Sequence, residues 1–69
     1  MIEVGSYWKY NIGDVVLVVV ENTTMRIEIG DVPRVIIKRI DDPHTKLEIQ
    51  VSTLLRFYTQ LTPLEMELL

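Results

Sequence analysis

Residues 15–20 read Val-Val-Leu-Val-Val-Val, and Glu21 follows this run. Valine is branched at Cβ, so it loses side-chain freedom in a helix and packs well on a pleated sheet. The run is far shorter than the about 20 residues that cross a bilayer as a helix. It therefore predicts a buried β-strand at residues 15–21, and no membrane span.

The rest of the composition agrees with this strand. Nine Val, eight Ile and six Thr make up one third of the 69 residues. Alanine, the best helix former, is absent. Apolar and polar residues alternate around Met25, Ile27 and Ile29 and again around Leu47 and Ile49, which is typical of strands buried on one face. Further strands are expected at residues 6–11, 25–29, 34–41 and 46–51. Turns are expected at residues 12–13, 22–24, 30–33 and 42–44, where Gly, Pro, Asn and Asp gather.

The pattern changes near the C-terminus. Residues 54–58 predict one helical turn, and residues 59–61 a last short strand. Thr62 stands three residues before Glu65 and Pro63 occupies the first helical position, which together form a capping box. A short helix at residues 63–68 is expected, with Leu64 and Leu68 packed on the body because so short a helix is marginal alone.

These elements predict one domain, residues 1–69, of the all-β class. Five or six short antiparallel strands with a helical turn before the last one describe a small SH3-like barrel with a short C-terminal helix. An OB-like barrel is the nearest alternative, but it usually needs more residues and a helix between its third and fourth strands.

Charge and cysteine content limit the function. The formal net charge is -3, whereas nucleic-acid binders usually carry a basic surplus, so a nucleic-acid partner is disfavoured. No cysteine is present to form a disulfide or a thiolate. The first residues have neither the basic start nor the apolar core of a signal peptide, so we expect a cytoplasmic location.

Few residues are suited to catalysis or metal binding. His44 is the single histidine, and zinc needs three or four ligands. Ser6 and Ser52 lack the surroundings of a nucleophile, and Glu28 and Glu48 suit ion pairs with nearby bases better than acid–base catalysis. We expect no catalytic residue, no metal site and no cofactor.

The aromatic stretch Tyr7-Trp8-Lys9-Tyr10 has two interpretations. Exposed aromatics of small barrels hold peptides, methylated lysines or bases. Alternatively, Trp8 fills the core, as a lone tryptophan in a tiny domain usually does, and this alternative is favoured. Tyr7 and Tyr10 are then candidates for surface contacts.

A basic cluster is expected around the fourth and fifth strands. Arg34 and Lys38 share a strand face, Arg39 faces the other way, and Lys46 follows in the next strand. The cluster is either a phosphate-binding patch or, as is commoner, a solvated face paired with glutamates. Arg34 and Lys38 are counted in the candidate interaction surface.

The valine run also predicts an oligomer. Val15, Leu17 and Val19 point to one face of the strand, and Val16, Val18 and Val20 form an apolar ridge on the other. A strand that is apolar on both faces needs a cover on each. A homodimer with two-fold symmetry supplies one, either by packing of the ridge face or by pairing of strand edges, and the sequence does not choose between these two contacts. In the competing account, the terminal helix covers the ridge and the chain is a monomer.

The chain resembles a known group of small proteins at its two ends. Residues 4–9, Val-Gly-Ser-Tyr-Trp-Lys, precede a Gly turn and a Val-rich strand, and residues 54–58 and Leu64-Glu65 form a matching tail. This pattern is similar to short SH3-like proteins of tailed phages and prophages. The resemblance implies a non-catalytic accessory protein that binds a host or phage protein in the host cytoplasm.

A second, weaker resemblance implies an alternative function. Gly13-Asp14-x-Val16 resembles the start of KOW-type SH3-like modules, which implies nucleic-acid binding. Neither resemblance assigns a function to a particular residue. An enzyme is the third and least favoured class.

Overall fold

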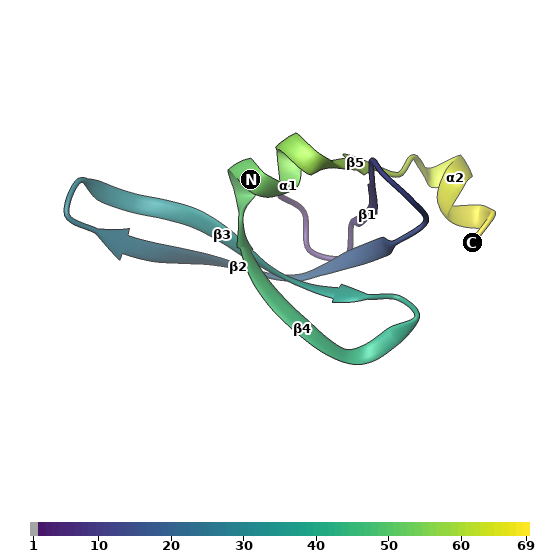
Figure 1. Cartoon of the computed structure of the whole chain (residues 1–69), viewed down its shortest axis with the longest axis horizontal. Coiled ribbons are helices and arrows are strands. Elements are labelled where there is room, and N and C mark those ends of the chain that lie inside the picture. Colours follow the sequence, from purple (N-terminus) through teal and green to yellow (C-terminus); the bar gives the residue numbers. More distant parts are fainter. Residues whose placement is uncertain (1) are drawn as a thin grey trace.

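A computed structural model describes residues 2–69, and its fold is mainly β (Figure 1). Five antiparallel strands form one sheet in the order β4-β3-β2-β1-β5, and two short helices accompany it. The elements are β1 (Tyr7–Tyr10), β2 (Val16–Ile27), β3 (Gly30–Arg39), β4 (Asp42–Gln50), α1 (Val51–Phe57), β5 (Tyr58–Gln60) and α2 (Pro63–Glu67). The predicted β-rich class, antiparallel strands and C-terminal helix are confirmed.

The middle of the chain differs from the prediction. The predicted turn at residues 22–24 and the predicted break at residues 30–33 do not exist, because β2 and β3 form one continuous ladder that turns at Glu28 and Ile29. Thr23 and Thr24 are β-branched and fit a strand as well as a turn. Pro33 pairs with Thr24 beyond the end of β4, where one edge of β3 is free and a proline is tolerated.

The next hairpin turns two residues earlier than predicted. Its turn is formed by Ile40 and Asp41, and Asp42 already belongs to β4. The Arg39 guanidinium donates to both carboxylate oxygens of Asp41, at 2.9 and 2.8 Å, which holds this turn. At the other end of β4, Val51 begins α1 instead of continuing the strand, and α1 is longer than the single turn expected.

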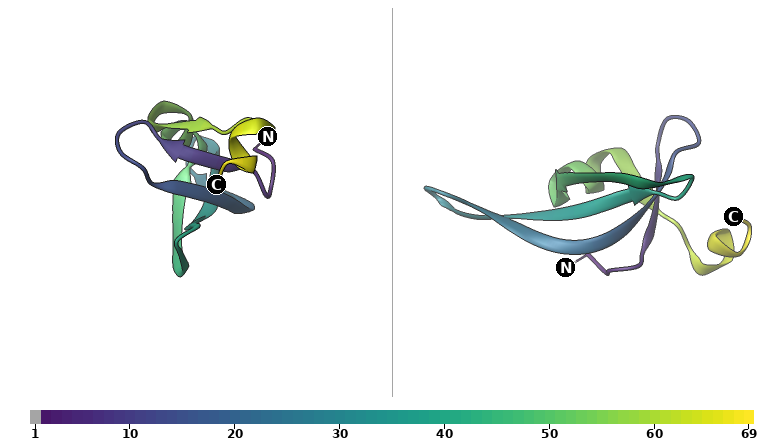
Figure 2. Two further views of the ribbon diagram at one scale, coloured as in Figure 1. Left: turned by 90° about the vertical axis from the view of Figure 1, so that its right-hand side faces the viewer. Right: turned by 90° about the horizontal axis from the view of Figure 1, so that it is seen from below.

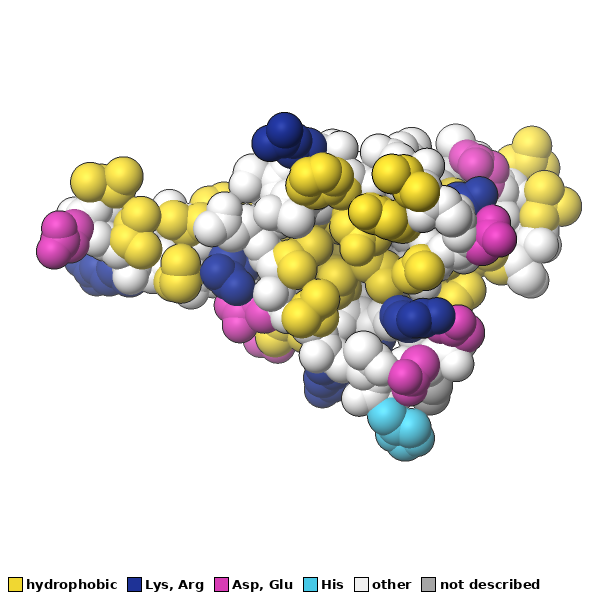
Figure 3. Space-filling view, in the orientation of Figure 1, with side chains coloured by type: hydrophobic (Ala, Val, Ile, Leu, Met, Phe, Trp, Pro, Cys, Tyr) yellow, Lys and Arg dark blue, Asp and Glu magenta, His cyan; other side chains and the backbone are white. Residues whose placement is uncertain are grey.

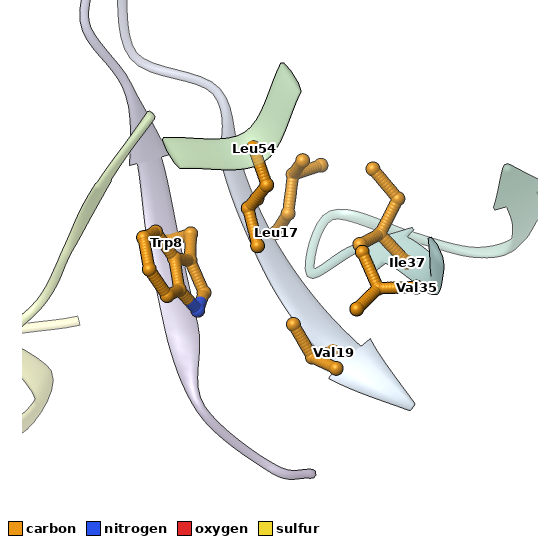
Figure 4. Packing of buried hydrophobic residues seen from close by; sticks show 6 residues of the cluster. All are labelled: Trp8, Leu17, Val19, Val35, Ile37 and Leu54. Atoms are coloured by element: carbon orange, nitrogen blue, oxygen red, sulfur yellow. The ribbon is translucent and has the colours of Figure 1, made fainter. Parts of the chain in front are cut away.

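The core lies between the curved sheet and α1 (Figure 4). Its centre is formed by Val19 and Val35, and Leu54 of α1 closes it with none of its surface exposed. Trp8 is only 6% exposed, so its predicted core position is confirmed. Its indole Nε1 donates to the Ser6 hydroxyl at 2.9 Å, and Ser6 in turn donates to the Glu3 carbonyl, so the buried polar atoms are satisfied.

A β-bulge divides β2 into two parts. Val19 lies opposite Ile37 and Glu21 lies opposite Ile36, so Val20 is the extra residue. A bulge bends a strand and increases its twist. The first part of β2 pairs with β1 and β3 in the body, and the second part runs outward with β3 alone (Figure 2).

The capping box of α2 is confirmed. The Glu65 N–H donates to Thr62 Oγ1 at 3.2 Å, and the Thr62 N–H donates to the Glu65 carboxylate at 3.1 Å. The expected packing of the helix is wrong, because Leu64 is 70% exposed and Leu68 is 82% exposed. Glu65 of α2 and Val16 both line a hollow of about 330 Å³, but Val18 and Val20 do not border it, and no residue of α2 is buried. Among the residues described, neither helix is long and apolar enough to cross a membrane.

Replacing Thr62 with Ala removes the cap, which should cost α2 about 1 kcal/mol. Because Leu64 and Leu68 do not pack on the body, the loss should appear as local fraying. Cα chemical shifts of residues 63–67 should move towards coil values, while the urea midpoint followed by Trp8 fluorescence changes little. Thr62→Ser is the control and should keep the helix. Unchanged shifts in Thr62→Ala would contradict the role of the cap.

Helix α2 should also respond to acid. The backbone hydrogen bond from Thr62, followed by the bond to its side chain, lowers the pKa of Glu65 below its ordinary value. The stabilisation is therefore complete above the unfolded-state pKa of about 4.3 and is lost as the pH falls through the lower folded-state pKa. Helical Cα shifts should decrease over this range, and Glu65→Gln should flatten the decrease. A pH-independent helix in the wild type would argue against the bond.

Candidate interaction surface

The outer part of the β2–β3 hairpin is a two-stranded arm, defined here as residues 24–33. The last β3–β4 pair joins Arg34 to Gln50, so the ladder from Thr24–Pro33 to Ile27–Gly30 has no third strand. Figures 1 and 2 show this hairpin projecting from the body. A two-stranded hairpin is marginally stable in water, so the arm depends on the body at its base.

The arm carries apolar side chains that the body does not cover. Met25 and Ile27 share one face and are each more than one third exposed, and Val32 lies opposite Met25. Ile29 stands in the turn at the tip and is 93% exposed. Apolar side chains are visible along the arm and across the middle of the face in Figure 3. The arm is therefore an apolar projection, not a solvated polar hairpin.

A polar network fixes the base of the arm. Glu48 Oε1 accepts hydrogen bonds from Arg34 Nε and from Thr23 Oγ1, both at 3.0 Å, which joins β2, β3 and β4. Arg34 also donates to the Glu48 carbonyl at 3.2 Å and contacts Met25 Sδ at 3.7 Å. Arg34 is thus paired with a glutamate of the same chain. This agrees with the favoured interpretation of the basic cluster, a solvated face whose bases pair with glutamates.

The other predicted members of the basic cluster are spread out. Arg39 is paired with Asp41, and the hydrogen bond between them, followed by their charges, raises the pKa of Arg39. The bond from Arg39 lowers the pKa of the Asp41 carboxyl. Lys46 is exposed on β4. Glu28 lies in the turn at the tip of the arm, so the predicted pairing of the bases with Glu28 is wrong.

A groove lies at the base of the arm, on the face that continues the core. Its volume is about 470 Å³. Its apolar lining comes from Val51 and Leu55 of α1, Pro33 of β3, and Ile2 of the N-terminal segment. The Asn22 amide donates to the Ile2 carbonyl at 2.6 Å and holds that segment in place. The groove is mostly apolar and opens beside the arm.

The predicted interaction residues lie on two faces. Tyr7, Val18 and Lys38 form one cross-strand row, and all three are half-buried. Val16 and Val20 lie along the same strand and are also half-buried, and Arg34 shares the strand face of Lys38. The row is continuous but only partly accessible.

Tyr10 is separated from Tyr7, because alternate residues of a strand face opposite sides. Tyr10 packs against Tyr58 of β5, with ring centroids 5.1 Å apart and the rings inclined by 50°. Burial, with a smaller contribution from Tyr10, raises the pKa of Tyr58. The two tyrosines hold β1 and β5 together at one end of the sheet.

The acidic and histidine side chains are dispersed. Within residues 2–69, no three His, Asp or Glu side chains lie close enough together to hold a metal ion. His44 is exposed at the start of β4, where its backbone N–H donates to Asp42 at 3.2 Å, and Thr45 donates to the other Asp42 oxygen. These contacts support the hairpin and leave His44 away from any pocket described above.

No protein-family model, curated protein or solved structure matches this chain. The sequence pattern does not reveal the arm, because Asn22-Thr23-Thr24 has the composition of a turn and so separates Met25 and Ile27 from the valine strand. The β-branched Thr23 and Thr24 were the available signal.

Replacing Glu48 with Ala should weaken the base of the arm. The Glu48 side chain is 45% exposed, so solvent screens the pair and the free energy of unfolding should fall by less than about 1 kcal/mol. Urea denaturation at low and high salt measures this loss, which should shrink at high salt. Glu28→Ala is the control, because Glu28 forms no ion pair within residues 2–69. A loss of several kcal/mol would mean that the pair behaves as a buried one.

Proposed function

We propose that this chain is a small, non-catalytic protein-interaction module with an SH3-like fold. It serves a tailed phage or prophage as an accessory protein that binds a host or phage protein. The strand order β4-β3-β2-β1-β5 and the position of α1 directly before β5 support the SH3-like assignment. The resemblance of residues 4–9 and 54–58 to short phage proteins supports the accessory role.

The main support for this proposal is the projecting arm. The chain exposes 5169 Å², whereas a compact monomer of 8.0 kDa exposes about 4,450 Å². Its radius of gyration is 12.4 Å, against about 11 Å for a compact domain of this length. The additional surface comes with exposed apolar residues, which in a soluble chain mark an interaction site.

The chemistry of the arm favours a protein partner over nucleic acid. Arg26 is outnumbered by Glu28 and Asp31, so the arm has a net charge of -1. Phosphates bind basic surfaces, and an acidic arm repels them. Met25, Ile27 and Ile29 instead fit an apolar surface on another protein, with the groove beside the arm available to one of its side chains. Docking would stabilise a hairpin that is marginal alone.

The test is capture of a partner from lysate of the source cell, followed by identification and binding of the purified pair. A Met25→Lys/Ile27→Lys variant should lose binding of the purified partner at least tenfold, because two charges would enter an apolar contact. Ile12→Lys is the matched control, since Ile12 is equally apolar and 75% exposed but lies in the loop after β1.

Circular dichroism must first show that both variants are folded. Equal partner binding by the arm variant and the wild type would contradict the role of the arm. Loss of capture after nuclease treatment would instead favour the nucleic-acid alternative.

A further inference from the structure

Strand β4 leaves one edge of the sheet unpaired. It has 9 residues and lies at the end of the strand order, with β3 on one side (Figures 1 and 2). Residues 47–50 pair with β3 in regular register, and a register shift between Ile37 and Arg39 leaves residues 43–46 opposite Lys38 alone. An unpaired edge presents backbone N–H and C=O groups that can pair with another strand. The other edge strand, β5, has 3 residues and offers a much shorter template.

The centre of β4 combines one exposed apolar side chain, which is unusual for a free edge, with two charged ones, which are common there. Leu47 is 56% exposed and borders a hollow of about 150 Å³ with Val15 and Tyr58. Lys46 and Glu48 flank it on the opposite face. Lys46 forms no ion pair within residues 2–69. Glu48 uses Oε1 for Arg34 and Thr23, and within the same residues its Oε2 accepts no hydrogen bond.

Symmetry limits how two copies of β4 can pair. A two-fold axis perpendicular to the sheet makes the strands antiparallel and places residues of the same face opposite each other. The axis must then lie midway between the two copies of one residue, which stand opposite each other in the new strand pair. Centred on Lys46, it places two lysines opposite each other, and centred on Glu48 it places two glutamates opposite each other. Both registers are disfavoured by like charges.

Centred on Leu47, the axis gives a complementary register. Lys46 of each copy lies opposite Glu48 of the other, so two ion pairs form, and the free Oε2 of Glu48 can accept from the lysine. Thr45 lies opposite Ile49, and the two Leu47 side chains meet at the axis, where both lose exposed apolar surface. The charges of Lys46 and Glu48 therefore favour this register over the two that are centred on Lys46 and on Glu48.

We propose that a second copy of this chain pairs along β4, with the two-fold axis at Leu47, so that the two sheets become continuous. This deepens the proposed interaction function by naming one partner. It also assigns the dimer to the β4 edge instead of the ridge of Val16, Val18 and Val20. The arm residues Met25 and Ile27 take no part in this register, which pairs residues 44–50 of the two copies.

The experiment exchanges the charges between copies. Lys46→Glu and Glu48→Lys should each raise the dimer dissociation constant about tenfold or more, because each replaces two opposite-charge pairs with two like-charge pairs. Mixing the two variants in equal amounts should restore a mixed dimer, in which both cross-strand pairs are again of opposite charge. Analytical ultracentrifugation over a dilution series measures all three samples and the wild type.

A wild-type chain that sediments at 8.0 kDa even at high micromolar concentration would overturn the proposal. So would assemblies larger than a dimer, which indicate pairing of β4 with β5 of the next copy, or variants that do not associate on mixing. If Val18→Lys splits the dimer while both β4 variants remain dimeric, the ridge is the interface and the proposal is wrong.

Amide hydrogen exchange provides a second measurement in case Glu48→Lys fails to fold. In the wild type, amides on the free edge at residues 44–50 should become protected as concentration rises, and the arm should not. Unchanged β4 exchange across a dilution series would overturn the dimer. A monomer that still binds its partner through Met25 and Ile27 would refute this inference alone and leave the proposed function intact.

Discussion

The antiparallel ladder between β2 and β3 is the constraint on which the rest of the structure depends. Leu17 and Val19 on one strand and Val35 and Ile37 on the other supply most of the buried core. Strand β1 is aligned by the first part of β2, and β4 by the second part of β3. Neither neighbour extends along the whole ladder, so the part that they leave uncovered becomes the arm.

The core that this ladder supports is small for the surface around it. Trp8 closes one side and Leu54 of α1 the other, but the face beside β4 stays open, with Leu47 largely in water. A domain of this length has a small free energy of unfolding, so burying part of this surface against another chain stabilises it substantially. The arm and the β4 edge are formed by different residues, 24–33 and 42–50.

Two segments with turn-like composition lie within strands for the same physical reason. Asn22-Thr23-Thr24 and Asp42-Pro43-His44 have the composition of turns, and each instead belongs to a strand. The hairpins turn where the ladder and local hydrogen bonds permit, at Glu28 and Ile29 and at Ile40 and Asp41. In the second hairpin, Arg39 and Asp41 form an ion pair across the turn, and this side-chain contact cannot be inferred from turn propensity. Turn-like composition therefore does not by itself interrupt a strand, because pairing with the neighbouring strand decides where the chain turns.

The sequence alone determined the features that depend on short-range chemistry. The β-branched run at residues 15–20 specified a strand, and Thr62 and Glu65 specified a helix start, because both effects act within a few residues. The size of Trp8 indicated a core position, which packing against distant residues then provided. Only the tertiary structure decided that β2 continues into an arm, that Leu64 and Leu68 remain in water, and that β4 has a free edge. Those outcomes depend on which strands extend far enough to cover one another, and that length is set by pairing between residues distant in the chain.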